Sequence, residues 1–109
     1  MPSKKKEKDA QSQIMEIDKL IHEPARLMIV AHLYVVVSAD FLFLMRQTGL
    51  TFGNLSSHLS KLEKADYVKI KKEFIGKKPH TMLELTKKGR DAFLTYRKSM
   101  KQVFEELPE

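Results

Sequence analysis

The spacing of the apolar residues changes near Asp66, and this change limits the folds that the chain can adopt. Upstream of that point, apolar residues recur every three or four positions, which is the period of an amphipathic helix. Over residues 68–85 they alternate with polar residues in two short runs, which is the period of a strand. The helical spacing returns after Thr86. We therefore predict a mainly helical α+β domain in which a β-hairpin precedes the last helix.

Length and composition predict a single globular domain. A chain of 109 residues can enclose one modest core, and 42% hydrophobic with 31% charged residues is typical of a soluble folded protein. The absence of cysteine excludes disulfides and thiolate metal sites. The polar N-terminus does not match a secretory signal, and no apolar run is long enough to span a bilayer. We expect a cytoplasmic protein with a flexible basic arm over residues 1–13 and one domain over residues 14–109.

The positive charge is concentrated in one part of the chain. Eight basic and two acidic residues lie between Tyr67 and Arg90, a difference that equals the net charge of the whole chain, +6. Localised positive charge predicts a polyanionic partner, with nucleic acid as the first candidate and an anionic membrane surface as the second. Solubility alone is the alternative explanation.

Two helices are expected before residue 38. Ile14, Ile17 and Ile21 follow helical spacing and predict a short amphipathic helix. Pro24 suits the first turn of a second helix, over residues 24–37. The valine run at the end of that segment is also compatible with a buried strand. We favour the helix because the pattern lasts longer than a strand.

The next segment predicts a helix-turn-helix. Ser38 or Asp40 can cap a helix over residues 39–47 by accepting hydrogen bonds from its free backbone N–H groups. Gly49 stands where the end of that helix requires a positive φ, and Thr51 can cap the following helix. A helix, a tight glycine-containing turn and a second helix therefore follow one another at the spacing of this motif.

The helix expected over residues 51–65 has an unusual outer face. Leu55, Leu59 and Leu62 share its buried side, while the opposite side carries small polar residues and no acid in its first three turns. A face that only meets water normally carries long charged side chains. Small side chains instead let a helix approach the base edges in a major groove about 12 Å wide. We predict that this face reads DNA; a weakly optimised solvent face is the alternative.

Two alternating runs flank a loop that contains Gly and Pro. The runs "YVKIKKE" and "TMLELT" predict strands, and the intervening "FIGKKPH" predicts a loop over residues 74–80. The pattern therefore indicates a β-hairpin with a basic tip. Such a hairpin could straddle the phosphate backbone beside the groove that the preceding helix enters.

The last helix, capped by Thr86, carries an apolar seam of about two heptads. This seam could pack within the chain on the first helix, or it could join two chains. We favour a homodimer, because two-fold symmetry also pairs two DNA half-sites. The residues expected at the dimer interface are Ile14, Ile17, Ile21, Phe93, Tyr96, Met100, Val103 and Leu107.

The runs "EPARLMIVAHLY" and "GLTFGNLSSHLSKLEKADYVKIKKEFIGKKPHTMLELTKKGRDAF" resemble winged helix-turn-helix regulators of the arsenical-repressor and multiple-antibiotic-resistance type. The resemblance covers residues 14–101. It implies a homodimeric prokaryotic transcriptional regulator that binds double-stranded DNA. The recognition helix, residues 51–65, is then expected in the major groove, and the basic wing, residues 67–86, on the backbone or in the minor groove.

The resemblance also implies which side chains contact DNA. From the recognition helix these are Thr51, Phe52, Gly53, Asn54, Ser56, Ser57 and Lys61, and from the wing Lys72, Lys77, Lys78 and His80. Two positions depart from the family pattern. Asp66 stands where Gly is common, which predicts a left-handed Asp at the helix end. His80 stands where Arg is frequent, which predicts a charge at the wing tip that varies near neutral pH.

The sequence gives little support for catalysis. It contains no Gly-rich phosphate loop, no Cys–His pair and no cluster with metal-ligand spacing, so we expect no enzyme, no metal and no cofactor. His22 and His32 suit core or surface positions better than ligand positions. Met28 and Met45 are expected to fill gaps in the core, although such methionines can also line the cavity of a small-molecule effector. A winged-helix module for protein–protein interaction is the alternative function.

Overall fold

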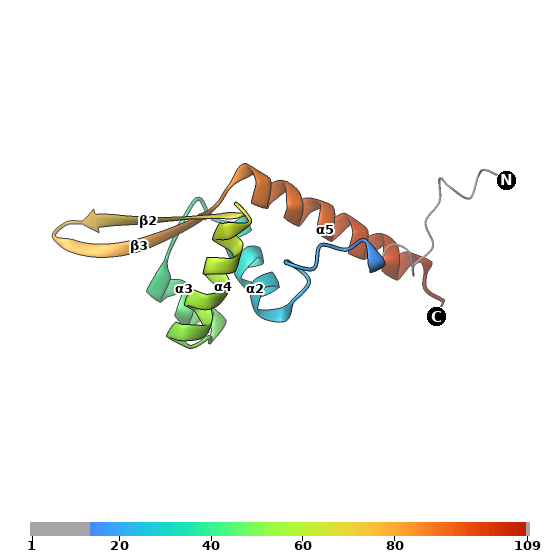
Figure 1. The fold of residues 1–109 in the computed structure, drawn as a ribbon, viewed down its shortest axis with the longest axis horizontal. Helices are drawn as coiled ribbons and strands as arrows, with labels where there is room; N and C mark the ends of the chain where they lie inside the picture. Colours follow the sequence, from blue (N-terminus) through green and yellow to red (C-terminus); the bar gives the residue numbers. More distant parts are fainter. Residues whose placement is uncertain (1–13, 109) are drawn as a thin grey trace.

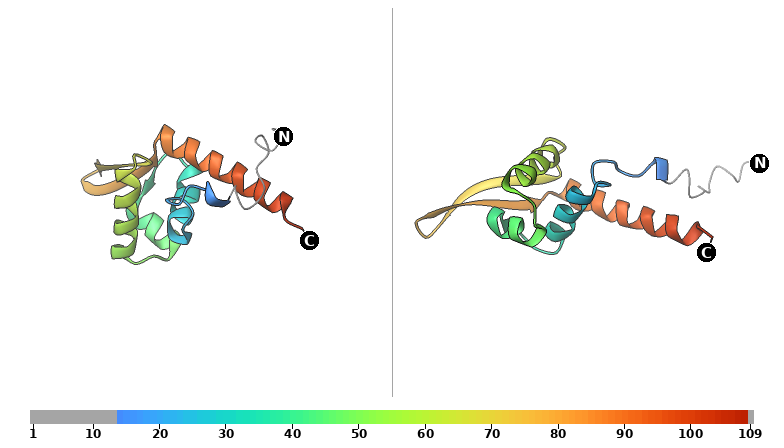
Figure 2. Two further views of the ribbon diagram at one scale, coloured as in Figure 1. Left: turned by 45° about the vertical axis from the view of Figure 1, so that its right-hand side comes forward. Right: turned by 90° about the horizontal axis from the view of Figure 1, so that it is seen from below.

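The computed structural model describes residues 14–108, which form four helices and a three-stranded antiparallel sheet of order β1-β3-β2. The elements are α2 (Pro24–Tyr34), β1 (Ala39–Asp40), α3 (Phe41–Thr48), α4 (Phe52–Lys64), β2 (Val68–Ile75), β3 (Lys78–Leu85) and α5 (Lys87–Glu106). Helices α2, α3 and α4 form a compact body from which the β2–β3 hairpin projects (Figure 1). Helix α5 leaves the same body in the opposite direction (Figure 2). The predicted mainly helical α+β fold with a hairpin before the last helix is confirmed. The expected basic arm lies outside the described residues.

The predicted helix over Ile14, Ile17 and Ile21 is wrong. Only residues 14 and 15 are helical, and the chain then runs through turns to the start of α2. The carboxylate of Asp18 accepts hydrogen bonds from the backbone N–H groups of Leu20 and Ile21, at 2.9 and 3.3 Å. Such local side-chain bonds offer the backbone an alternative to the helix. Two of the three isoleucines are nevertheless buried, because the turn brings Ile17 and Ile21 against α5.

Helix α2 begins at Pro24, as predicted, and ends three residues before the predicted end. The side chain of Glu23 caps its first turn by accepting from the backbone N–H of Arg26 at 2.8 Å. At the other end, the guanidinium of Arg90 donates to the carbonyls of Tyr34 and Val36, each at 3.1 Å. These bonds satisfy carbonyls that a continuing helix would have used. The chain therefore leaves the helix at residue 35.

The helix-turn-helix is built as its capping residues predict. The Asp40 carboxylate accepts from the first free N–H groups of α3, and Gly49 ends that helix with φ of 75°. Thr51 caps α4 by accepting from the N–H of Asn54 at 3.1 Å. The short strand β1, which places Asp40 opposite Met82 of β3, was not predicted from the sequence.

Helix α4 ends in a Schellman motif. The N–H of Tyr67 donates to the carbonyl of Leu62, and the N–H of Asp66 donates to that of Glu63, both at 2.9 Å. Asp66 has φ of 65°, so the predicted left-handed Asp is confirmed. The motif turns the chain directly from α4 into the hairpin.

The hairpin is longer than predicted, and its loop is shorter. Residues 74–80 were expected to form a loop, but the strands continue until Phe74 pairs with Pro79 and Ile75 pairs with Lys78. Only Gly76 and Lys77 remain in the turn, and Gly76 has φ of 66°. A glycine with positive φ at the first central position is typical of a type II′ turn, which continues the twist of the strands.

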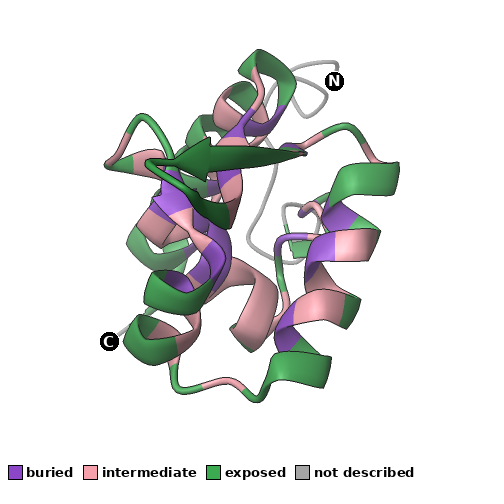
Figure 3. Cartoon of the chain, turned by 90° about the vertical axis from the view of Figure 1, so that its left-hand side faces the viewer, coloured by how far each residue is buried: buried purple, intermediate pink, exposed green. Residues whose placement is uncertain are grey.

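The main core lies where the helical body meets the base of the sheet. Buried residues of α2, α3, α4 and the three strands face this core, and exposed residues face outward (Figure 3). Helix α5 enters this arrangement through a close backbone approach at Gly89. A Cβ atom added there would lie only 2.2 Å from the carbonyl oxygen of Tyr67, so the start of α5 requires glycine. No helix in the described part of the chain is both long and apolar enough to cross a membrane.

Candidate nucleic-acid interface

Helix α4 offers solvent the small polar face that the sequence predicted. Leu55, Leu59 and Leu62 are at most 2% exposed and anchor the helix to the core. The predicted contact residues in the first turn, Thr51, Phe52, Gly53 and Asn54, are all exposed, as are Ser57 and Lys61. Ser56 is only half-buried, because it lies at the edge of the packed side.

The electrostatics of α4 favour an anion near its start. Its first turn contains no acid, whereas Lys61 and Lys64 lie in its last turn. The free backbone N–H groups give a helix N-terminus a partial positive charge. The exposed start of α4 therefore combines hydrogen-bond donors, small side chains and no repulsive carboxylate.

The hairpin projects beside the α3–α4 unit and carries exposed lysines along its length (Figure 1). The three lysines predicted to contact DNA, Lys72, Lys77 and Lys78, are exposed. Lys71 differs from them because its Nζ lies 3.6 Å from carboxylate oxygens of both Glu73 and Glu84. Part of the hairpin charge is therefore paired at its middle, while the tip stays basic.

His80 does not lie at the wing tip, where it was expected. Its Nδ1–H donates to the Asp40 carboxylate at 2.7 Å, and only 30% of its side chain is exposed. This hydrogen bond, together with those from the N–H groups of Phe43 and Leu42, holds the pKa of Asp40 below its ordinary value. His80 therefore joins the hairpin to the start of α3, and its contact with DNA stays a prediction.

The basic residues after the hairpin are largely engaged within the chain. Lys87, Lys88 and Arg90 are three of the eight basic residues between Tyr67 and Arg90 whose concentration predicts a polyanionic partner. Lys87 instead donates to the Asp91 carboxylate at 2.8 Å, and the Nζ of Lys88 lies 5.8 Å from the ring centroid of Tyr67. Arg90 caps α2, as described above, and stacks 5.5 Å from the ring centroid of Tyr34. Arg90 is therefore committed to the fold, whereas Lys87 and Lys88 stay exposed, and their contact with phosphate stays a prediction.

Sequence reasoning missed two exposed residues at the hairpin tip. Phe74 and Ile75 are 75% and 54% exposed. They were assigned to a loop because Gly76 and Pro79 are loop signals. Two adjacent apolar residues inside a lysine-rich hairpin were the signal that could have revealed them.

The predicted dimer residues divide into three groups, which are buried, half-buried and exposed. Ile17, Ile21, Tyr96 and Val103 are buried in one cluster of a single chain, which corresponds to the intrachain packing that the sequence left open. The ring of Phe93 packs 5.0 Å from that of Tyr34, and Met100 is half-buried. Ile14 and Leu107 are exposed, and so is Phe104, which was not predicted.

The histidines outside the hairpin have partners within the chain. His22 shares a 2.8 Å hydrogen bond with the Tyr96 hydroxyl, and the ring of His32 bonds the carbonyl of Met28 at 2.8 Å. The guanidinium of Arg26 donates to Nδ1 of His58 at 3.1 Å. Within residues 14–108, no three His, Asp or Glu side chains are grouped so that they could hold a metal ion.

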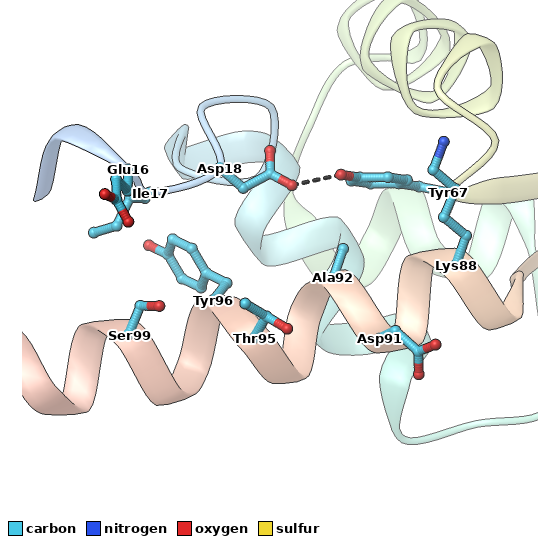
Figure 4. Close-up of a pocket in the computed structure, with 10 residues that line it drawn as sticks. All are labelled: Glu16, Ile17, Asp18, Tyr67, Lys88, Asp91, Ala92, Thr95, Tyr96 and Ser99. Atoms are coloured by element: carbon cyan, nitrogen blue, oxygen red, sulfur yellow. Dashed lines mark hydrogen bonds between the residues drawn. The ribbon is translucent and has the colours of Figure 1, made fainter. Parts of the chain in front are cut away.

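A cavity of about 340 Å³ lies between the N-terminal segment and α5 (Figure 4). Its lining includes a 2.5 Å hydrogen bond from the Tyr67 hydroxyl to the Asp18 carboxylate (Figure 4). Further along, Tyr96, Thr95 and Ser99 of α5 line it. Burial of the phenol, together with the adjacent carboxylate of Asp18, raises the pKa of Tyr67 to about 12. Burial also raises the pKa of Tyr96.

We expect one of the three tyrosines to titrate with a pKa of about 12, and we assign it to Tyr67. The folded pKa lies above the ordinary value of 10.0. The contribution of the neutral Tyr67 phenol to the free energy of unfolding is therefore fully present below about pH 10 and is lost as the pH rises through 12. Ultraviolet difference titration of the wild type and of Tyr67→Phe measures this. The variant should lack the late transition, and a Tyr67 transition at or below pH 10 would contradict the assignment.

Known proteins share this architecture. The family described as winged helix DNA-binding domain matches residues 25–104. An uncharacterized protein of Methanocaldococcus jannaschii is 38% identical over 78 residues, which are 72% of this chain and 85% of that protein. The solved structure of a transcriptional regulator homologue from Pyrococcus horikoshii matches with a TM-score of 0.83 and 31% identity, covering 92% of this chain and 98% of that chain.

A MarR-like transcription regulator from Bacillus cereus shares the fold at lower identity. Its TM-score is 0.66 at 18% identity, over 83% of this chain and 67% of that chain. The chain is therefore similar in sequence to an archaeal protein and similar in fold to MarR-like regulators. With its family match spanning α2 to α5, this chain belongs to the winged helix DNA-binding domain family.

Proposed function

We propose that this protein is a transcriptional regulator that binds double-stranded DNA sequence-specifically, with α4 in the major groove and the hairpin on the backbone or in the minor groove. The observation that carries the proposal is the exposed and acid-free start of α4, with small residues at Gly53, Asn54 and Ser57, beside a hairpin with a basic tip. The activity is binding, and the proposal assigns no chemical step to the protein.

The two elements would share the work of recognition. The amide of Asn54 matches the donor and acceptor of an adenine edge, while Ser57 can serve a base or a phosphate. The space beside Gly53 is open, since a Cβ atom built there would meet no other atom of the chain within 4 Å. Because glycine has no side chain, DNA could approach the backbone of α4 closely at this position. The lysines of the hairpin would neutralise phosphates, which fix orientation but carry no sequence information.

Binding at a series of salt concentrations tests the proposal. The probe is a set of duplexes that the protein selects from a random-sequence library, compared with an unselected duplex of the same length. On logarithmic axes, affinity should fall with salt with a slope of about 0.9 for each phosphate neutralised. Selected duplexes should bind more tightly at every salt concentration. A flat salt dependence, or no binding at low salt, would favour the protein–protein interaction module.

We also propose that the protein acts as a homodimer joined through its terminal segments. Phe104 and Leu107 near the end of α5 are 65% and 45% exposed, and Met15 and Ile14 are 70% and 48% exposed. These side chains are still available to a second chain, whereas Tyr96 is already buried within one. Two-fold symmetry would place two α4 helices about 34 Å apart, which is one turn of DNA.

Light scattering of Phe104→Glu tests the dimer. We expect the wild type to have twice the 12.7 kDa mass of one chain and the variant to have the mass of one chain, because a buried charge opposes association. Lys98→Glu, which changes an exposed charge on a different face of the same helix, is the control and should stay dimeric. A dimer that survives Phe104→Glu would place the interface elsewhere.

The cavity beside Tyr67 is where we would place a small-molecule effector. Its lining includes the Asp18–Tyr67 hydrogen bond, and the N–H of Tyr67 belongs to the Schellman motif that ends α4. A ligand that separates these two side chains would therefore act on the segment that orients the recognition helix. A thermal-shift screen of small polar aromatic compounds, repeated on Tyr67→Phe, would reveal ligands whose effect depends on this residue.

A further inference from the structure

The tip of the hairpin presents large apolar side chains to solvent. Phe74 is 75% exposed and Ile75 is 54% exposed, and both immediately precede the turn. The last cross-strand pair that reaches the core is Ile70 with Leu83. The two apolar residues at the tip therefore add nothing to the core, and their exposure requires another explanation.

The register gives this tip the form of a wedge. Successive side chains of a strand point to opposite faces, so Phe74 and Ile75 lie on the two faces of the ribbon. Phe74 lies opposite Pro79, and Ile75 lies opposite Lys78. The tip therefore carries apolar surface on both faces, and a two-residue turn keeps its end narrow.

The charges around the wedge indicate the kind of partner. Lys72, Lys77 and Lys78 are exposed on the same hairpin, while the nearest acid, Glu73, lies 3.6 Å from the Nζ of Lys71. A partner that fits the tip therefore carries negative charge on its surface, next to the lysines, and has an apolar site that can accept the side chain of Phe74. Duplex DNA meets both requirements, because phosphates line its grooves and apolar side chains can enter between base steps.

We propose that the wing tip inserts Phe74, next to Pro79 on the same face of the ribbon, at a base step in the minor groove and thereby bends the DNA. The inference rests on the proposed DNA-binding function. The lysines at the turn hold the flanking phosphates, and the apolar wedge partly unstacks one step, which kinks a duplex toward its major groove. The contact distinguishes flexible steps from stiff ones without reading base edges.

Energy transfer between dyes at the two ends of a selected duplex measures the bend. We expect the wild type to shorten the end-to-end distance, and Phe74→Ala to abolish the shortening and to weaken binding about tenfold, since an aromatic contact with a base is lost. The salt slope should stay unchanged because the lysines remain. Val37→Ala, at a residue 84% exposed outside the hairpin, is the control and should bend DNA like the wild type.

Phe74→Lys separates the wedge from simple charge. Added positive charge alone would strengthen binding, whereas the proposal expects the bend to disappear even though the salt slope increases. Thermal unfolding of each variant verifies that the fold persists. Salt-dependent binding without a bend in the wild type would overturn this inference and leave the proposed function intact. Absence of salt-dependent DNA binding would overturn both, as would Phe74-dependent binding to anionic lipid vesicles without any binding to duplexes.

Discussion

Replacing Gly89 by alanine is expected to lower the free energy of unfolding by about 3 kcal/mol, at the upper end of the usual cost of overpacking. The added Cβ would lie 2.2 Å from the carbonyl oxygen of Tyr67, and 2.9 Å from its carbonyl carbon. That oxygen also accepts the N–H of Thr86 at 3.0 Å. Because both partners are backbone, neither can rotate away. The start of α5 and the base of β2 would have to separate.

Chemical denaturation of Gly89→Ala and Gly53→Ala provides the measurement and its control. Gly53 is also in the first turn of a helix, but an added Cβ there meets nothing within 4 Å. We expect Gly53→Ala to be neutral or to stabilise the fold by about 0.5 kcal/mol, because alanine loses less backbone entropy in a helix. If the two variants changed the free energy of unfolding equally, the contact between a Cβ at residue 89 and the carbonyl of Tyr67 would not be the reason for a glycine at that position.

Replacing Asn54 and replacing the lysines of the turn should affect DNA binding in different ways. Asn54→Ala is expected to reduce the preference for one base pair by about 1–3 kcal/mol, roughly fivefold to 150-fold, because it removes an amide that can pair with a base edge. Lys77→Ala with Lys78→Ala should weaken binding to all sequences and lower the salt slope by about 2, or about 1 for each phosphate contact.

Competition between selected and unselected duplexes at several salt concentrations separates the two effects. Lys101→Ala, in the exposed part of α5, is the control for loss of charge away from the interface. If Asn54→Ala and the double lysine variant caused the same uniform loss, α4 would not be the element that reads sequence. Its leucine anchors would still explain the fold.

The parts of the fold that were predictable depend on local rules. Gly49 and Thr51 end one helix and begin the next through their own backbone and side-chain chemistry, so their roles could be predicted from neighbouring residues alone. The left-handed Asp66 follows the same logic. The alternating pattern likewise located the strands and the buried leucines located the inner face of α4.

The errors have causes that lie outside a local pattern. Arg90 shortens α2 from more than fifty residues away, and His80 is drawn to Asp40 across forty residues. The spacing of the isoleucines suggested a helix, but a carboxylate at Asp18 satisfied the same backbone donors in a turn. The seam on α5 is an apolar face, as predicted. Periodicity alone, however, does not distinguish packing of Tyr96 within its own chain from packing against a second chain.

The Asp40 carboxylate makes two kinds of hydrogen bond, and together they influence how the helices are placed relative to the hairpin. One oxygen caps α3 and the other accepts from His80 of β3, so this residue joins the helical unit to the hairpin in addition to the pairing of β1 with β3. We expect this bond to limit how far the wing can move relative to the α3–α4 unit when the protein binds a ligand. On a duplex, the contacts of α4 and those of the hairpin would therefore lie at a nearly constant distance from each other. That distance would not depend on the bases between them.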